Sequence, residues 1–213
     1  FSEPVADTVL GYILCFARQI PWLDQNLRSG VWSKKPLFSL SEQSLGVIGV
    51  GNVGKSVIRR AKAFSMSILA HDIKNIPTPF SDEYDIEIVS KTDLLSRADF
   101  VSLNCDLNPT SFHILSDAEF SIMKPTACLI NTARGPLVDE PALIRALKNS
   151  KIGGAALDVF EQEPLPKESE LLSIKNCILS PHNSNSSHKS WEKVHLNTLN
   201  NLIEGLINKD QVK

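Results

Sequence analysis

The sequence has no long hydrophobic run, no excess of charge and no positively charged start. Its apolar stretch near the N-terminus, residues 9–17, is interrupted by Gly11 and Tyr12 and is far shorter than the roughly 20 residues that a transmembrane helix needs. Acidic residues precede it, so it does not have the form of a secretory signal peptide. The 22 Lys and Arg residues nearly balance the 24 Asp and Glu residues, and a net charge of -2 does not attract polyanions. These features argue against a membrane or a nucleic acid as the partner.

Cysteine is scarce and is not spaced for metal binding or for a disulfide framework. The four residues are scattered without a CxxC pair, mostly in apolar runs where a thiol behaves as a small hydrophobic group. No His residue joins them in a convincing metal site, so we expect no bound metal. Unpaired cysteines favour a reducing, cytoplasmic location over secretion. The cysteines are Cys15, Cys105, Cys128 and Cys177.

The length and composition are those of a globular protein. With 213 residues, 42% of them hydrophobic and 22% charged, the chain can form one large domain, or one domain and part of a second. The sequence begins without Met and within what we interpret as the first turn of a helix, so we expect that a preceding segment has been removed. Residues 4–20 are apolar on nearly all sides, which predicts a helix that is buried on more than one side.

Residues 21–44 show neither a helical nor a strand period. The segment contains several proline, glycine and serine residues and is predicted to form an irregular arm. Its two tryptophans, Trp22 and Trp32, either contact a partner or cover the core of the domain. The sequence supports both interpretations about equally.

From residue 45 to residue 190, short apolar runs alternate with longer amphipathic ones. This alternation is typical of parallel strands joined by crossover helices. Right-handed crossovers place helices on both faces, so we predict an α/β fold of the Rossmann type with a doubly wound parallel sheet. The expected strands are residues 45–50, 67–71, 86–89, 100–103, 127–131, 155–159 and 177–180, and the expected helices are residues 53–64, 93–98, 117–123 and 140–148. Residues 191–213 are predicted to form a final helix that packs on the domain, and a tail.

A glycine-rich loop follows the first predicted strand and opens the first crossover helix. Its sequence is Gly49-Val50-Gly51-Asn52-Val53-Gly54, and its place between strand and helix distinguishes a dinucleotide-binding loop from a chance pattern. Gly49 lets the chain turn, Gly51 lets the backbone touch a pyrophosphate, and Gly54 lets helix and strand pack closely. Phosphate oxygens then meet free N–H groups at the positive end of the helix dipole.

An acidic residue, Asp72, lies 18 residues after Gly54, at the end of the second predicted strand. There its carboxylate can accept both ribose hydroxyls of adenosine and would repel a 2′-phosphate, so we expect NAD (NADH) as the cofactor rather than NADP. Lys74, two positions later, weakens this preference. The alternative is that Asp72 is a solvated turn residue.

Polar residues also follow three later predicted strands. They lie in residues 131–135 (Asn-Thr-Ala-Arg-Gly), 157–164 (Leu-Asp-Val-Phe-Glu-Gln-Glu-Pro) and 180–183 (Ser-Pro-His-Asn). Ligands of doubly wound sheets bind at the carboxyl ends of the strands, so we expect these stretches to lie near the cofactor.

Together with the glycine loop, the order and spacing of these stretches resemble those of the D-isomer-specific 2-hydroxyacid dehydrogenases, the family of phosphoglycerate dehydrogenase and hydroxypyruvate reductase. The resemblance runs from residue 4 to the C-terminus and implies three catalytic residues, Arg134, Glu163 and His182. It further implies cofactor contacts by Asn52 and Val53 at the pyrophosphate, by Cys105, Thr132, Ala133, Arg134 and His182 along the cofactor, and by Asp158 at the nicotinamide carboxamide.

The three catalytic residues suit the reaction that the resemblance implies, a hydride transfer between NAD(H) and a small 2-hydroxy or 2-keto acid. The hydroxyl proton needs a base, and the imidazole of His182 suits this role near neutral pH. Glu163 would hold the ring and favour the imidazolium. Arg134 would orient the substrate carboxylate and carbonyl through its planar fork of donors. Taken singly, each of them could be an ordinary surface or loop residue.

The resemblance also assigns the remaining segments. Residues 1–20 would be a hinge helix to a substrate domain that is mostly absent from this chain, and residues 21–44 would form a homodimer contact. The cofactor domain, residues 45–190, would then bind NAD but turn over poorly alone, because closure against the substrate domain completes the site. Asp106, where relatives usually have Pro, and the polar residues 183–187 leave the identity of the 2-hydroxy acid open.

Two other functions are compatible with the glycine loop. Some relatives with this fold regulate transcription and use NAD to control association, so an NAD-sensing, corepressor-like binding protein is the main alternative. The other is an NAD-using enzyme of the adenosylhomocysteine hydrolase type, which would not be expected to have Arg, Glu and His in this order. The set of Arg134, Glu163 and His182 favours the dehydrogenase.

Overall fold

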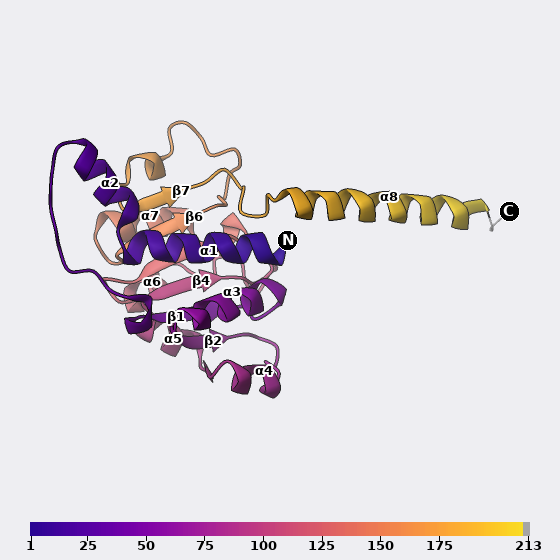
Figure 1. Cartoon of the computed structure of the whole chain (residues 1–213), viewed down its shortest axis with the longest axis horizontal. Helices are drawn as coiled ribbons and strands as arrows, with labels where there is room; N and C mark the ends of the chain where they lie inside the picture. The colour runs from indigo at the N-terminus through magenta and orange to yellow at the C-terminus, as the bar shows by residue number, and fades with distance from the viewer. Residues whose placement is uncertain (211–213) are drawn as a thin grey trace.

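A seven-stranded sheet forms the centre of the molecule (Figure 1). In the computed structural model, which describes residues 1–210, the strand order is β3-β2-β1-β4-β5-β6-β7 and all neighbouring strands are parallel. The strands are β1 (Ser44–Ile48), β2 (Ser67–His71), β3 (Ile86–Ile88), β4 (Phe100–Leu103), β5 (Cys128–Asn131), β6 (Gly154–Leu157) and β7 (Cys177–Leu179). The predicted doubly wound sheet is confirmed, and β2 and β4 have the predicted bounds.

The strand order reverses between β1 and β4. The chain runs outward from β1 through β2 to β3, returns to β4 beside β1, and continues outward through β5, β6 and β7. Loops that leave the sheet on opposite faces at such a point create a crevice at its carboxyl edge. Ile48 pairs with His71 on one side and with Leu103 on the other, so the loops after β1, β2 and β4 start at the same edge.

Helices cover both faces of this sheet (Figure 1). They are α1 (Ser2–Ala17), α2 (Ile20–Arg28), α3 (Asn52–Ala63), α4 (Thr78–Glu83), α5 (Lys91–Arg97), α6 (Asp117–Ile122), α7 (Glu140–Lys148) and α8 (His188–Asp210), with short 3-10 turns η1 (Leu40–Glu42), η2 (Gly135–Leu137) and η3 (Glu170–Ser173). One core contains residues of α1 and α3, such as Ile13 and Val57. The other contains residues of α5, α6 and α7, such as Leu95 and Phe120.

Helix α1 packs along α3 on one face of the sheet. Its buried residues, among them Val9 and Ile13, form one stripe, and its other apolar positions are partly exposed. Arg60 of α3 binds the carboxylates of Glu3 and Asp7 at 2.8 and 2.6 Å. Within the described residues α1 is thus fully buried only along the side that faces α3 and the sheet, and not on several sides as its composition predicts.

Residues 21–44 differ from the predicted irregular arm, because α2 forms their first part. Pro21 lies in the first turn of this helix, where a missing N–H breaks no hydrogen bond. Trp22 donates its Nε1–H to the carbonyl of Lys175 at 2.9 Å, and its ring lies against an aromatic ring of α1. Trp22 therefore covers the domain, whereas Trp32 is 87% exposed.

The short helix α4 is absent from the sequence-based prediction. It has Pro77 at its N-cap and a second proline in its first turn, so its six residues show no helical period. Phe80, which is buried, attaches the helix to the core that contains α1 and α3. Tertiary packing, rather than periodicity, accounts for this element.

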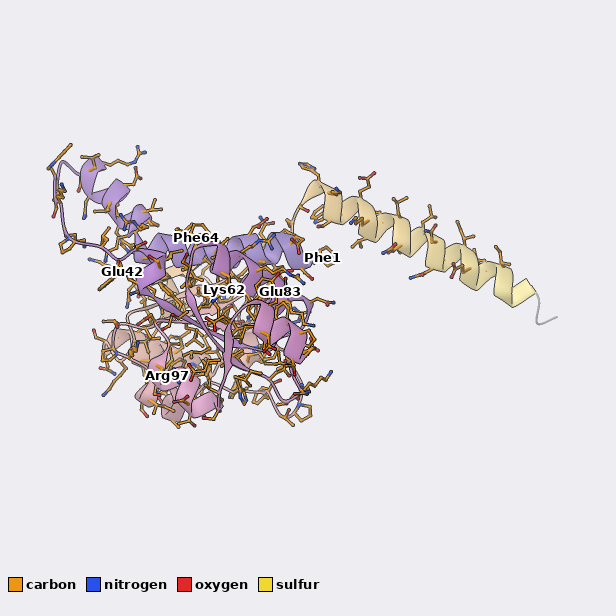
Figure 2. The ribbon with its side chains drawn as sticks, turned by 60° about the horizontal axis from the view of Figure 1, so that its bottom comes forward. Phe1, Glu42, Lys62, Phe64, Glu83 and Arg97 are labelled. Carbon is orange, nitrogen blue, oxygen red and sulfur yellow. The ribbon has the colours of Figure 1, made fainter. Side chains whose placement is uncertain are left out.

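The C-terminal helix α8 extends away from the domain (Figures 1 and 2). Its side chains from Trp191 to Ile207 are exposed, so the prediction that it packs on the domain was wrong. Leu199, for example, is 51% exposed. Both cores are formed by residues of the sheet and of helices such as α1, α3 and α5 to α7, and neither contains a residue of α8. The last residues of the predicted tail, 211–213, lie outside the described residues.

None of the helices within residues 1–210 combines the length and the hydropathy that crossing a bilayer requires.

Candidate active site

The glycine loop joins β1 to α3 where the strand order reverses. Gly49 has a left-handed φ of +90°, and a Cβ there would lie 2.6 Å from the backbone N of Cys105. A Cβ at Gly54 would overlap the carbonyl oxygen of Gly49, so helix and strand touch through their backbones. At Gly51, by contrast, a Cβ would meet no atom within 4 Å. The loop is thus tightly packed at both ends and open in the middle.

The N-terminus of α3 is open to an anion. Gly51 is the N-cap of this helix, and no side chain caps it. The first N–H groups of a helix lack partners within the helix and attract phosphate groups. Asn52 and Val53 form the first turn, and Asn52 is exposed. The open space at Gly51 and the uncapped helix therefore fit a dinucleotide pyrophosphate.

Asp72 follows β2 and contacts the glycine loop directly. The backbone N–H of Val50 donates to its Oδ2 at 2.7 Å, and the backbone N–H of Lys74 donates to its Oδ1 at 2.8 Å. A carboxylate has about four lone-pair sites, so it can accept further hydrogen bonds from hydroxyl groups. The negative charge thus lies beside the loop that would hold the pyrophosphate.

A cavity of about 470 Å³ lies beside this loop. Its wall is formed by α1, by the start of α3 and by the loops that follow β4, β5 and β7. Six residues expected near the cofactor line this one cavity: Val53, Cys105, Thr132, Ala133, Arg134 and His182. Burial raises the pKa of the Cys105 thiol, so this group stays protonated near neutral pH. The glycines of the loop, Asp72, Asp158 and Glu163 do not form part of its lining.

Glu163 and His182 form a hydrogen-bonded pair at the edge of this cavity. Nδ1 of His182 lies 2.8 Å from Oε2 of Glu163, and the N–H of Phe160 donates to Oε1 of Glu163 at 3.0 Å. Burial acts to raise the pKa of Glu163, but the hydrogen bonds from His182 and Phe160 outweigh it, and the pKa lies below its ordinary value. The ionised carboxylate therefore holds the ring through Nδ1 and leaves Nε2 for a reaction partner.

Asp158 is fully buried and holds the loop that contains His182. Its Oδ1 accepts the N–H of Asn183 and its Oδ2 accepts the N–H of Ser184, both at 2.9 Å. His182 itself has a left-handed φ of +52°, a conformation that non-glycine residues adopt only where surrounding contacts impose it. Both carboxylate oxygens of Asp158 thus accept backbone N–H groups after His182, and its expected contact with the nicotinamide carboxamide stays a prediction.

Arg134 reaches the same cavity from the loop after β5. Its side chain is exposed, and Nη1 donates to the carbonyl of Ala133 at 2.6 Å. None of the ion pairs within residues 1–210 includes Arg134, so its remaining donors can bind an anion. The cavity thus combines a cationic fork with an imidazole.

Several residues of the cavity wall were not expected from the sequence. They are Phe1, Val5, Leu103, Asn104 and Leu107, whereas Asp106, Ser184 and Asn185 lie at positions already connected with the substrate. Asn104 follows β4 in the way that Thr132 follows β5, so its place after a strand was the available signal. Asn104 Oδ1 and Thr132 Oγ1 are buried and have no hydrogen-bond partner among the described residues. Such atoms are rare, and their place in this wall fits a polar ligand.

A doubly wound sheet with an open glycine loop at its reversal point and an acid after β2 defines a dinucleotide-binding domain. Comparison with known proteins names the family. The model of the D-isomer specific 2-hydroxyacid dehydrogenase NAD-binding domain matches residues 10–184, and the chain belongs to this family. The expected family and its NAD-binding domain are thereby confirmed.

Individual relatives extend the comparison. The chain is 41% identical to a D-3-phosphoglycerate dehydrogenase of Methanocaldococcus jannaschii, over 89% of this chain and 36% of that protein. It is 37% identical to a glyoxylate reductase of Korarchaeum cryptofilum, over 100% of this chain and 68% of that protein. The crystal structure of D-lactate dehydrogenase from Aquifex aeolicus, complexed with NAD and lactic acid, superposes with a TM-score of 0.90 at 28% identity, covering 99% of this chain and 68% of that one. The chain therefore spans between about a third and two thirds of the length of these relatives.

Proposed function

We propose that this chain is the cofactor domain of an enzyme that transfers a hydride between NAD(H) and a small D-2-hydroxy acid or 2-keto acid. One observation supports the proposal most directly. His182, oriented by Glu163, and Arg134 line the same cavity, and Val53 at the start of α3 lines it as well. A base, a carboxylate-binding fork and a nucleotide loop at one cavity are what this reaction needs.

His182, Glu163 and Arg134 each have a separate role in the proposed reaction. NADH, when bound, supplies the hydride to the carbonyl carbon of the keto acid. Nε2 of His182 donates a proton to the carbonyl oxygen in this direction and accepts it from the hydroxyl in the reverse direction. Glu163 stabilises the protonated ring through Nδ1. Arg134 holds the substrate carboxylate and carbonyl so that the reacting carbon faces the nicotinamide.

Asp72 selects NAD over NADP in this proposal. Its carboxylate lies beside the glycine loop, bound to the N–H of Val50. A 2′-phosphate on the ribose would meet this negative charge, whereas two hydroxyls would donate to it. The hydrogen bond from Lys74 to Asp72 is donated by the backbone N–H of Lys74 and not by its ammonium group.

The substrate is proposed to be a small 2-keto acid such as glyoxylate or hydroxypyruvate. Relatives of this chain include glyoxylate reductases and glyoxylate/hydroxypyruvate reductases. The test is NADH oxidation, followed by absorbance, in the enzyme that includes a substrate domain. We expect oxidation with either acid and loss of the rate in Arg134→Ala. If NADH binds and neither acid is reduced, the NAD-sensing interpretation gains support.

The proposal also assigns the segments that precede the sheet. We propose that α1 is the hinge to a substrate domain and that residues 21–44 form a homodimer contact in a reducing, cytoplasmic environment. Free thiols on all four cysteines support the reducing environment. Trp32 and the neighbouring Leu27 and Val31 are 87%, 56% and 51% exposed, which supports a contact surface on the arm.

The proposed homodimer contact of residues 21–44 can be tested by measuring whether the chain is a dimer or a monomer in solution. Sedimentation should give a dimer for the wild-type chain and a monomer for Trp32→Glu. Leu172→Glu, which changes an exposed apolar residue of η3, serves as the control and should remain a dimer. A wild-type chain that stays monomeric at high concentration contradicts the assignment.

A further inference from the structure

The loop of residues 158–164 contains two glutamates that pair with two different histidines. Glu163 binds His182, and Oε1 of Glu161 lies 2.8 Å from Nε2 of His113. The side chains of His113 and Glu161 are 31% and 32% exposed. His113 comes from the segment between β4 and α6 and does not line the cavity. The proposed hydride transfer uses only the first pair, so the second pair needs its own explanation.

Glu161 attaches this loop to the start of α7. Its Oε1 also accepts the N–H of Glu140 at 3.1 Å, and its own N–H donates to Oε2 of Glu140 at 3.3 Å. Glu140 is the first residue of α7, where free N–H groups and the helix dipole favour an acceptor with negative charge. Both the side chain and the backbone N–H of Glu161 therefore hold this loop against α7, two residues before Glu163.

His113 attaches the same loop to the segment that contains Arg134. Its backbone N–H donates to the carbonyl of Pro136 at 2.9 Å, and a bridge between Leu115 and Val138 continues this contact. Its ring stacks on that of Phe112, with the ring centroids 3.9 Å apart. Its φ of +48° is a left-handed value that non-glycine residues seldom adopt, so these contacts impose its conformation.

The segments of Arg134 and Glu163 touch each other directly. A Cβ at Gly135 would overlap the carbonyl group of Phe160, which leaves no space between the two backbones. The N–H of Phe160 in turn donates to Oε1 of Glu163. A shift of Phe160 would therefore move Glu163, and with it the ring of His182.

We propose that His113 is a positioning residue for the catalytic pair. Through Glu161 it holds the loop in the alignment that sets Glu163, and so the imidazole of His182, relative to Arg134. The inference rests on the proposed function. The position of the His182 imidazole matters for the rate, because a catalytic group displaced by about 1 Å can lower a rate by roughly 10²-fold.

The first test needs no catalysis. In the chain labelled with 15N in histidine, the ring signals of His182, assigned by their loss in His182→Ala, report which ring nitrogen bears the proton. In the neutral ring of the wild type, we expect the proton on Nδ1, which donates to Glu163. In His113→Ala we expect signals averaged between the two tautomers, and in His113→Gln, whose amide can still donate to Glu161, signals near those of wild type. His195→Ala, on the exposed helix α8, is the control.

The second test measures the rate in the enzyme that includes a substrate domain. We expect His113→Ala to lower kcat by roughly 10- to 100-fold with an unchanged KM for NADH, and His113→Gln to recover most of the loss. Glu161→Ala should lower kcat similarly, and the double variant should lose no more than either single one, because the two residues act through one contact.

Failure of the His113 proposal and failure of the proposed function give different results. Unchanged His182 ring signals and an unchanged kcat in His113→Ala overturn the proposal, even if that variant unfolds at a lower temperature. If the wild-type chain does not bind NADH, the proposed function fails, whereas the ring signals of His182 still decide whether His113 positions that side chain.

Discussion

The backbone N–H of Val50 donates to Oδ2 of Asp72 at a distance of 2.7 Å. The residue that we expect to select the ribose thus also fixes the loop that we expect to bind the pyrophosphate. Because the other carboxylate oxygen accepts the N–H of Lys74, Asp72 joins two loops at the carboxyl edge of the sheet. Changes at this side chain should therefore alter affinity and specificity together.

Replacing Asp72 by Ala should lower NAD affinity by roughly 10- to 100-fold. Hydrogen bonds to a charged group contribute about 1.5–3 kcal/mol, and this change removes both the ribose acceptor and the anchor of Val50. Asp72→Asn keeps an acceptor oxygen but loses the charge, so the ratio of NADP to NAD affinity should rise. Calorimetry with both nucleotides measures these effects. Asp82→Ala, an exposed acid of α4, is the control, and equal NAD affinities of Asp72→Ala and wild type would exclude this role.

Replacing His182 by Ala should lower kcat of the enzyme with its substrate domain by roughly 10²- to 10⁴-fold, with little change in NAD affinity. This is the usual contribution of general acid–base catalysis, and the nucleotide loop does not depend on the imidazole. Glu163→Gln should lower kcat less, because it removes the charge beside Nδ1 and keeps an oxygen that can accept. Single-turnover NADH oxidation measures both. An undiminished rate in His182→Ala would remove this residue from the mechanism.

The sequence predicted those parts of the fold and site that local chemistry determines. Within one β-α unit, Gly54 lets α3 approach the carbonyl of Gly49, and Gly49 itself needs a left-handed φ. Strands such as β2 and β4 are short, mostly apolar runs. The apolar period of α8 predicts a helix, but it does not reveal whether that helix packs on the domain, because packing depends on contacts far apart in the sequence. The same holds for Asp158, whose partners Asn183 and Ser184 lie 25 and 26 residues away.

Asp99 provides a pH-dependent contribution to stability. Its carboxylate accepts the N–H and hydroxyl of Ser44 and the ammonium of Lys124, all at 2.8 Å. Burial acts to raise the pKa of Asp99, but these hydrogen bonds outweigh it, so the pKa in the folded state is lowered. The stabilisation is therefore fully present above the unfolded pKa of about 3.9 and is lost as the pH falls through the lower folded value.

Urea unfolding measures this contribution. We expect Asp99→Asn to lower the free energy of unfolding at about pH 7 by roughly 1–3 kcal/mol, and the difference from wild type to shrink as the pH falls to about 3. Asp93→Asn, on the exposed side of α5, should show a much smaller difference at both pH values. A difference between wild type and Asp99→Asn that does not change with pH would contradict the assignment.

Gly54 and Gly51 should respond to the same substitution in different ways. In Gly54→Ala the new methyl group overlaps the carbonyl oxygen of Gly49, so α3 must move away from β1. We expect the free energy of unfolding to fall by roughly 1–3 kcal/mol, the usual cost of overpacking, together with a loss of NAD binding. Because both properties change, this variant alone does not separate folding from cofactor binding.

Gly51→Ala makes that separation, because a Cβ at Gly51 meets no protein atom within 4 Å and the residue has a φ of -75°, which alanine adopts readily. The fold should keep its stability in urea, whereas the methyl group would occupy space beside the N–H groups that face the pyrophosphate. We expect NAD affinity to fall by at least about tenfold, measured by calorimetry on the same samples. Gly205→Ala, also in open space but on α8, is the matched control and should bind NAD like wild type. Normal NAD binding by Gly51→Ala would mean that the pyrophosphate does not lie against this loop, because only contact with the ligand makes a side chain at this position unfavourable.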